Sequence, residues 1–479
     1  MLIVKMPDSA RRERDYVLSI LLGRWLGIKF RTEFGTAPPG RVVISGPLGC
    51  VTQPDLFLPE AERDWCGRQT CPDASQYRLR KDLPDHWSRC LGDSDLPVLF
   101  ELKEQSLLSR VDASDGQREL RLSFDLLGTA FFFLSRYEEV VAAVERDEHD
   151  RFSAWSSCAG KAGLLDRPVV NEYLEILWLS LKEIDPGCKR KKRSFEVVPT
   201  HDVDRPFCYH GVSAKRMAKI GMGQLRAGRG LGSVLNLGRG WVKTRLTGAP
   251  DPYYTFPWIL KTSEEQKISN TFYIQCTRSE YPEDDNYNHL DRRIISFVQE
   301  AARQGHRVGL HPGYGTYRNS RTLSAEMDRF RELWRISDCG ELVEWRSRQH
   351  FLRWHQEITP GILNEAGIHF DSTLGFADSP GFRCGCCYDY PLYDLRNRKP
   401  LVIIEEPLIL MECSIIDDRY LGLGAGKDAL DLARKVWRKC RHFNGQFVFL
   451  WHNHRLVKDG ERALYEAILG INGEKGPSV

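Results

Sequence analysis

The residue types best suited to chemistry lie in residues 195–207, which read FEVVPTHDVDRPF. An apolar run comes first, and His201, Asp202 and Asp204 follow it within four positions. A short apolar run bounded by polar residues predicts a buried strand. Two carboxylates and an imidazole at the end of such a strand are costly to bury unless they hold a metal, meet charged partners or take part in catalysis. The alternative interpretation is an ordinary turn, in which aspartates are common.

Several later strands are also predicted to end in polar residues. Strands are expected at 270–276, 306–317, 342–351, 368–376, 401–412 and 445–454, with helices between them at 290–305, 323–337, 359–367 and 427–445. Together with the first strand, their ends carry Asp202, Asp204, His311, Arg348, His350, Asp371 and His452. Alternating strands and helices with chemistry at the carboxyl ends are typical of an α/β barrel or a doubly wound sheet, and a length of roughly 265 residues suits a barrel. We therefore expect these side chains at one rim of one domain.

The first half of the chain predicts a separate α+β domain. Helices are expected at 13–27, 125–152 and 168–184, and strands at 41–46, 96–102 and 118–128. Before residue 190 there is no glycine-rich phosphate loop, serine elbow or metal-spaced histidine pair. This half is therefore interpreted as structural or substrate-shaping. A Pro-Gly break and the basic run KRKKR within 185–194 are typical of a linker, so we place the domains at 1–190 and 191–479.

Two clusters in the first half have simple interpretations. The charged residues of 125–152, among them Arg136, Glu138 and Glu139, are expected to form a solvated helix face. Cys66 and Cys71 have no second cysteine pair to complete a zinc site.

The composition excludes several classes of protein. A chain of 479 residues is too long for one ordinary domain, and a net charge of +3 is too small to favour a nucleic-acid partner. The 14 cysteines are scattered, and the first residues lack a signal-peptide pattern. No apolar run reaches the length of about 18 residues that a membrane span needs. These features predict a cytoplasmic protein with mostly free thiols.

An unusual basic segment follows the opening motif. Residues 205–250 contain no Asp or Glu, while Lys and Arg accumulate among glycines. One interpretation is a flexible excursion over an acidic neighbouring surface. The other is contact with an anion, either a phosphate-bearing substrate or the headgroups of an anionic membrane.

The motifs resemble those of a known family. THDVD (200–204), GLHPGYGTY (309–317), RQHFLRW (348–354), FDSTLGFADSPGFRCG (370–385) and FLWHNH (449–454) occur in the order found in NodB-type polysaccharide deacetylases, the carbohydrate esterase family 4. The chain looks closest to a bacterial subgroup associated with surface-polysaccharide clusters. That subgroup carries an additional amino-terminal domain of unknown function, with blocks like FFFLSRYEE and RDEHDRF.

The resemblance implies a fold, a reaction and residue roles. The fold would be a distorted (β/α) barrel of about seven strands, and the reaction the metal-assisted removal of an acetyl group from an N-acetylated sugar or polysaccharide precursor. Asp202 would be the general base, held ionised by Arg348, and His452 the general acid. Asp204 and His311 would bind a divalent metal ion, with zinc the expected one. The same motif blocks offer Tyr314, Asp371 and Arg383 as substrate contacts.

The sequence departs from the family pattern at one metal ligand. The family's second metal histidine follows the first by four residues, and that position is Gly315 here. His350 is our candidate for the third ligand, with His201 and Asp371 as the next choices. Cys384 and Cys387 form a CxxC pair without a second pair, so we expect free thiols in a loop over the rim. The alternative function is a catalytically silent barrel that binds carbohydrate or serves in assembly.

Overall fold

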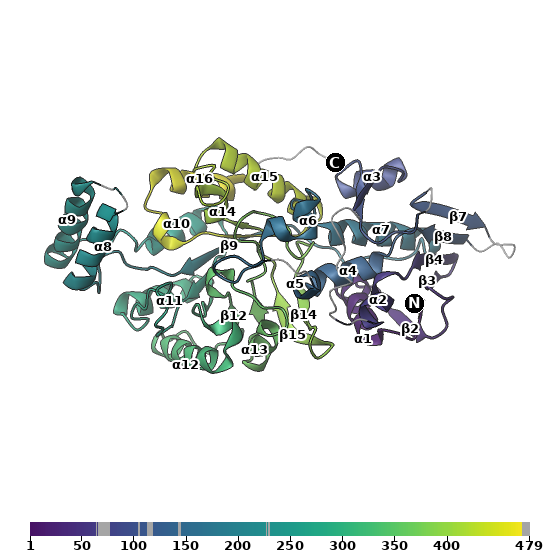
Figure 1. The fold of residues 1–479 in the computed structure, drawn as a ribbon, viewed down its shortest axis with the longest axis horizontal. Coiled ribbons are helices and arrows are strands. Elements are labelled where there is room, and N and C mark those ends of the chain that lie inside the picture. Colours follow the sequence, from purple (N-terminus) through teal and green to yellow (C-terminus); the bar gives the residue numbers. More distant parts are fainter. Residues whose placement is uncertain are drawn as a thin grey trace.

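The computed structural model describes residues 1–63, 65, 77–103, 106–112, 118–141, 145–226, 228 and 230–471. Cys66 and Cys71 lie outside these residues. The molecule is elongated (Figure 1). The first sheet lies at one end, the second sheet lies near the middle, and a pair of helices forms the other end. None of the described helices combines the length and apolar character needed to cross a bilayer.

The first sheet is built from the amino-terminal half. Its strands lie in the order β2-β1-β3-β4-β8-β7: β1 (Leu2–Met6), β2 (Phe30–Phe34), β3 (Arg41–Gly46), β4 (Gly49–Pro54), β7 (Leu108–Asp112) and β8 (Arg118–Leu122). β5 (Arg78–Arg80) and β6 (Leu96–Val98) form a separate pair. Alternate residues of β1 are buried, as expected for a strand with one face on a core.

The first half of the chain also contains helices, of which α7 packs against β3 and β4. They are α1 (Arg11–Leu18), which continues as a π-helix over Ser19–Leu26, α2 (Phe57–Arg63), α3 (Asp85–Leu91), α4 (Leu126–Leu134), α5 (Glu138–Val141), α6 (Cys158–Lys161) and α7 (Val169–Ile184). The helices predicted at 13–27 and 168–184 are therefore confirmed.

The second sheet carries the opening motif near its middle. Its order is β14-β15-β13-β12-β11-β10-β9-β17-β16, with β9 (Glu196–Val203), β10 (Thr271–Ile274), β11 (Arg307–Leu310), β12 (Arg346–Ser347), β13 (Phe370–Asp371), β14 (Tyr390–Asp394), β15 (Lys399–Glu405), β16 (Leu410–Met411) and β17 (Gln446–Leu450). All neighbours pair in parallel except β14, which is antiparallel to β15. β9 is buried beyond its first residue, as a covered parallel sheet requires.

Helices alternate with these strands, as the sequence predicts. They are α10 (Phe256–Gln266), α11 (Arg292–Arg303), α12 (Ser320–Ile336), α13 (Thr359–Glu365), α14 (Glu412–Ile416), α15 (Lys427–His442) and α16 (Asp459–Gly470). Because the parallel strands run the same way, their carboxyl ends meet at one edge of the sheet.

A barrel of about seven strands is not what the described strands form. They make an open sheet of nine, with β14 and β16 at its two ends and no pairing between them. β14 occupies one edge by folding back antiparallel on β15, and β16, with two residues, offers little backbone for further pairing. The α/β class predicted from the sequence holds, whereas closure of the sheet does not.

The charged face predicted at 125–152 is wrong for Arg136, Glu138 and Glu139, whereas Asp147 and Glu148 are exposed but lie outside a helix. The helix is interrupted after Leu134, and Arg136 adopts a φ of 53°. That break turns the chain inward, so Arg136, Glu138 and Glu139 are all buried. Arg136 Nε donates to Glu139 (2.9 Å), and Arg383 from the second half donates to both oxygens of Glu139 (2.9 and 2.8 Å). Burial raises the pKa of Glu139, but Arg383 and Arg136 outweigh it and lower that pKa to about 2.

This buried pair generates a stability prediction. Arg383→Met leaves the Glu139 carboxylate buried with one guanidinium fewer, and we expect a loss of about 3–5 kcal/mol in the free energy of unfolding. Urea unfolding followed by circular dichroism measures it. Arg292→Met, at an exposed arginine of α11, is the matched control and should change stability by no more than about 0.5 kcal/mol. Equal stability of the two variants would contradict a structural role for the Arg383 pair.

Candidate active site

A cavity of about 460 Å³ opens at the carboxyl ends of the central strands. It is lined mainly by polar and charged side chains, with a few apolar ones from the strand ends. The polar lining residues include Arg151, Asp202, Asp204, Arg216, Asp285, His350, Tyr420, His452 and His454. A volume of several hundred Å³ is the size of a small-molecule site.

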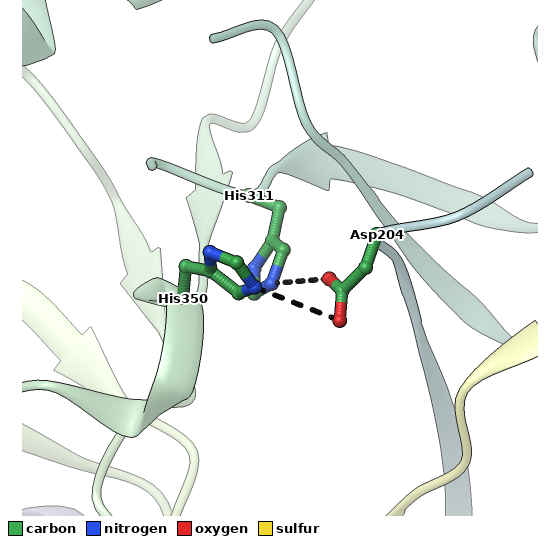
Figure 2. A group of neighbouring side chains, drawn as sticks. All are labelled: Asp204, His311 and His350. Carbon is green, nitrogen blue, oxygen red and sulfur yellow. Dashed lines mark ion pairs between the residues drawn. The ribbon is translucent and has the colours of Figure 1, made fainter. Parts of the chain in front are cut away.

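Two of these residues, together with the adjacent His311, could hold a metal ion. Asp204, His311 and His350 each offer a ligand atom, and those atoms lie within 4.8 Å of one another. His311 Nε2 lies 3.0 Å from Asp204 Oδ1, and His350 Nε2 lies 3.6 Å from Asp204 Oδ2. Figure 2 shows both rings turned towards the carboxylate.

The other ring nitrogen of each histidine is already engaged. His311 Nδ1 donates to the backbone carbonyl of Arg348 (2.5 Å), and His350 Nδ1 donates to Asp284 Oδ1 (2.8 Å). These bonds orient the two rings so that each Nε2 faces Asp204. Backbone carbonyls and carboxylates are the usual outer partners of metal-binding histidines.

The donor set fits a divalent ion such as zinc. Ligands about 2.1 Å from a tetrahedral ion lie about 3.4 Å from one another, and the two measured separations bracket that value. Asp204 Oδ1 and His311 Nε2 are buried and have no hydrogen-bond partner within the described part of the chain. An ion between them would satisfy both atoms. One carboxylate and two imidazoles form a common catalytic zinc set.

The charges around Asp204 favour its ionised form. Burial raises its pKa, but the imidazoles of His350 and His452 outweigh burial and hold that pKa well below its usual range. Burial lowers the pKa of His350, while Asp204 and Asp284 raise it to about 9. The site therefore concentrates opposite charges where water is largely excluded.

The backbone explains how His350 reaches the site. Its N–H donates to the carbonyl of Pro312 (3.0 Å), which ties the segment to the residue after His311. Phe351 and Leu352 then adopt φ values of 61° and 55°, a left-handed turn that is rare for bulky side chains.

At Gly315, a Cβ would lie 2.5 Å from the Tyr281 ring, so Tyr281 occupies the space that a larger residue needs.

Asp202 is held by a fully buried arginine. Arg348 Nη1 donates to Asp202 Oδ1 (3.2 Å) and to Thr200 Oγ1 (2.6 Å). Its Nε donates to the Ser372 carbonyl (2.8 Å), so the guanidinium spans the ends of three strands. Asp202 Oδ2 lies 3.7 Å from His311 Nε2 and lines the cavity.

His452 also lies close to Asp204. Its Nε2 lies 3.3 Å from Asp204 Oδ2, and its Nδ1 donates to Glu412 Oε1, which also accepts the His452 backbone N–H (3.2 Å). Burial lowers the pKa of His452, but Glu412 and Asp204 outweigh it and raise that pKa well above its usual value. The fully buried Glu412 has its pKa lowered to about 2, because the charge of His452 outweighs desolvation.

Some predicted residues lie elsewhere. His201 points to the opposite face of β9, as a neighbour of Asp202 must, and contacts the Trp451 carbonyl and Tyr465 Oη (2.8 and 3.1 Å). Asp371 is fully buried and accepts from Ser347 Oγ (2.5 Å). Neither it nor Tyr314 or Arg383 lines the cavity.

Tyr314 and the thiols of the CxxC pair have other surroundings. The Tyr314 N–H donates to Asp284 Oδ1 (3.0 Å), so it supports the partner of His350. Cys384 and Cys387 are free thiols as predicted, but they are buried rather than placed over the rim. Burial raises the pKa of Cys384 to about 12.

Three residues of this site were not predicted from the sequence. Asp284 lies in a loop after β10, and its acidic neighbours gave no periodic signal. Glu412 directly follows β16, so its place at a strand end was the available signal. Arg151 comes from the first half and donates to Tyr420 Oη (2.9 Å) at the cavity, a contact that no local pattern predicts.

Comparisons with known proteins give weak likenesses. The model of a family of unknown function (DUF7033) matches residues 73–186, and no curated protein matches the chain. A solved structure described as a polysaccharide deacetylase from Mycobacterium smegmatis is 18% identical, with a TM-score of 0.37 over 59% of this chain and 85% of that one.

Two further solved structures have similar scores. A mutant of a CE4 family pseudoenzyme with restored enzymatic activity is 11% identical, with a TM-score of 0.29 over 59% of this chain and 65% of that one. Agd3, described as a novel carbohydrate deacetylase, is 8% identical, with a TM-score of 0.34 over 96% and 80%. At these TM-scores the likenesses decide neither the fold nor the function of this chain.

The three-ligand geometry generates a prediction about metal affinity. His311→Ala and His350→Ala should each weaken zinc binding by more than about 100-fold, because losing a ligand costs more than losing an outer partner. Asp284→Asn should cost about 10–100-fold. Isothermal titration of the metal-free protein with zinc measures all three.

His454→Ala is the matched control, since this imidazole lines the same cavity but is not among the three grouped residues. Its zinc affinity should stay within a few-fold of the parent protein. Full affinity in His350→Ala would remove His350 from the ligand set.

Proposed function

We propose that this protein is a metal-dependent hydrolase that removes an acetyl group from an N-acetylated sugar. One observation carries the proposal: a single cavity and the side chains that contact its lining bring together three kinds of group. They are the metal-fitting set of Asp204, His311 and His350, the carboxylate of Asp202 against Arg348, and the imidazole of His452 against Glu412. A protein that only binds carbohydrate has no need of both a base and an acid.

Asp204, His311 and His350 would hold the ion. A divalent ion supplies Lewis acidity, which polarises an amide carbonyl and makes water a usable nucleophile at neutral pH. The residues around it then have to move protons, because amide hydrolysis takes a proton from water and gives one to the leaving amine.

Asp202 suits the role of general base. Arg348 donates to one of its oxygens, and the other faces the cavity beside His311. Because Arg348 is held by Thr200 and Ser372 as well, Asp202 stays in one orientation. A fixed carboxylate loses little entropy when it accepts a proton from a water in the cavity.

His452 suits the role of general acid. Glu412 holds Nδ1 and stabilises the protonated ring, so Nε2 can donate a proton into the cavity. The two residues would act as in other imidazole–carboxylate pairs, where the buried carboxylate orients the ring and stabilises its protonated form.

The substrate class follows from the polar lining and the sequence motifs. The lining is rich in groups that hydrogen-bond hydroxyls, and the volume of about 460 Å³ accommodates a sugar unit. The likeness of THDVD and LHPGY to polysaccharide deacetylases supports bacterial surface-polysaccharide metabolism in the cytoplasm as the setting. We also infer that 191–479 is the catalytic domain, an opened variant of the distorted barrel, and that 1–190 is a separate domain.

A second candidate is a silent barrel that binds carbohydrate without hydrolysis. Gly315, in place of a metal histidine, is the observation that favours it. It predicts weak zinc binding and no release of acetate from any N-acetylated sugar. Metal content and acetate release, measured together on a panel of N-acetylated sugars, separate the two candidates.

We expect Asp202→Asn to lower the rate of acetate release by about 10²–10⁴-fold, the usual cost of losing a general base. Zinc affinity should change little, because Asp202 is not one of the three grouped residues. Asp285→Asn, which alters another carboxylate of the same cavity, is the control and should retain activity within a few-fold. Full activity of Asp202→Asn would exclude Asp202 as the base.

Glu412→Gln tests the support of His452. Glutamine still accepts a hydrogen bond from Nδ1 but no longer stabilises the charged ring, so kcat should fall by about 10-fold or more with little change in KM. His452→Ala should cost more than Glu412→Gln does. A rise in KM with an unchanged kcat would instead assign Glu412 to substrate binding.

A further inference from the structure

We propose that the pair of helices formed by residues 214–247 docks on an anionic membrane surface. The pair comprises α8 (Ala214–Arg226) and α9 (Leu231–Thr247), which pack together and project from one end of the molecule (Figure 1). We call it the basic hairpin. The docking does not depend on the proposed function.

The basic hairpin exposes apolar side chains that the rest of the chain leaves uncovered. α9 has 17 residues and none is buried. Leu231, Leu235 and Leu246 are 71%, 60% and 80% exposed, and Val242 is 45% exposed. Their spacings of four, seven and four place them along one stripe of the helix. Isolated exposed leucines are ordinary, but a continuous stripe on a projecting helix indicates a binding surface.

Packing between the two helices does not bury this apolar surface. They approach closely at Gly221, where a Cβ would lie 3.1 Å from Val234. Beside that contact is a groove of about 410 Å³ whose lining residues carry no charge. A second groove, of about 580 Å³, combines Leu235, Val242 and Leu246 with Arg239 and Lys243.

The positive charge of the segment favours an anionic partner. Residues 205–250 hold no acidic side chain, and the described basic residues of the hairpin are Lys215, Arg216, Lys219, Arg226, Arg239, Lys243 and Arg245. An apolar stripe flanked by Lys and Arg is the pattern of a helix that lies in the interface of an anionic bilayer. Two copies of this hairpin face to face would instead bring like charges together, and a nucleic acid would leave the leucines uncovered.

The base of the hairpin reaches the active-site cavity. Arg216 of α8 pairs with Asp285, and both residues line the cavity. A membrane under the hairpin would therefore lie close to the cavity mouth. If the proposed function holds, such a position suits a sugar that is carried on a lipid.

Vesicle co-sedimentation of the full-length protein tests the docking. The protein should sediment with vesicles of phosphatidylcholine and phosphatidylglycerol at low salt, and not with phosphatidylcholine alone. Added salt should weaken the binding, because it screens exposed charges. Asp202→Asn should sediment like the parent protein, so failure of the catalytic proposal and failure of the docking are distinguishable.

Two variants locate the binding surface. Lys215→Gln with Lys219→Gln and Lys243→Gln should weaken binding roughly 100-fold. Leu231→Ser with Leu235→Ser and Leu246→Ser should weaken it at both low and high salt. The matched control replaces Arg292, Arg321 and Lys427 with glutamine, which removes the same charge from exposed sites outside the hairpin.

Three results would overturn the proposal. The first is no sedimentation with anionic vesicles at low salt. The second is an equal loss of binding in the control and the lysine variant. The third is self-association of the lipid-free protein that the leucine variant abolishes, measured by analytical ultracentrifugation, since it would assign the stripe to a second copy of the chain.

Discussion

The buried guanidinium of Arg348 is the constraint on which the site depends. A charge taken fully out of water has to be matched by acceptors in fixed places. Arg348 finds them on Thr200 and Asp202 of β9 and on Ser372, which directly follows β13. Its own backbone carbonyl accepts from His311. One residue thus fixes Asp202 and His311 relative to each other, and the parallel register of the strands supplies the edge at which they meet.

The first half of the chain supports the site from outside the sheet. Tyr16 Oη donates to the Pro391 carbonyl (2.7 Å), and Trp25 Nε1 donates to the Asp389 carbonyl (3.0 Å), so β14 and the residue before it rest on α1 and its π-helical continuation. The buried Arg136–Glu139–Arg383 network crosses the same boundary. Desolvated charges of this kind cost free energy unless every partner is in place, so they specify one arrangement of the two halves.

Local patterns in the sequence predicted the central strands and most strand-end residues. β9, β10 and β17 are short apolar runs, and Asp202 and Asp204 share a face because they are two residues apart. The partners of these residues were not predictable in the same way. Asp284 and Glu412 reach the site through contacts that span 66 and 40 residues of sequence, and no local period encodes such contacts. The predictions of a closed barrel and of a solvated charged face at 136–139 were wrong for the same reason, since both features depend on long-range packing.

Asp284 and Asp285 are adjacent in the chain but have different partners. Asp284 orients His350, whereas Asp285 binds Arg216 at the base of α8. A single peptide unit therefore connects the orientation of the His350 ring to the anchorage of the hairpin. Coupling between two binding events is reciprocal in free energy. If lipid at the hairpin changes the zinc affinity by some factor, zinc in the cavity must change the lipid affinity by the same factor.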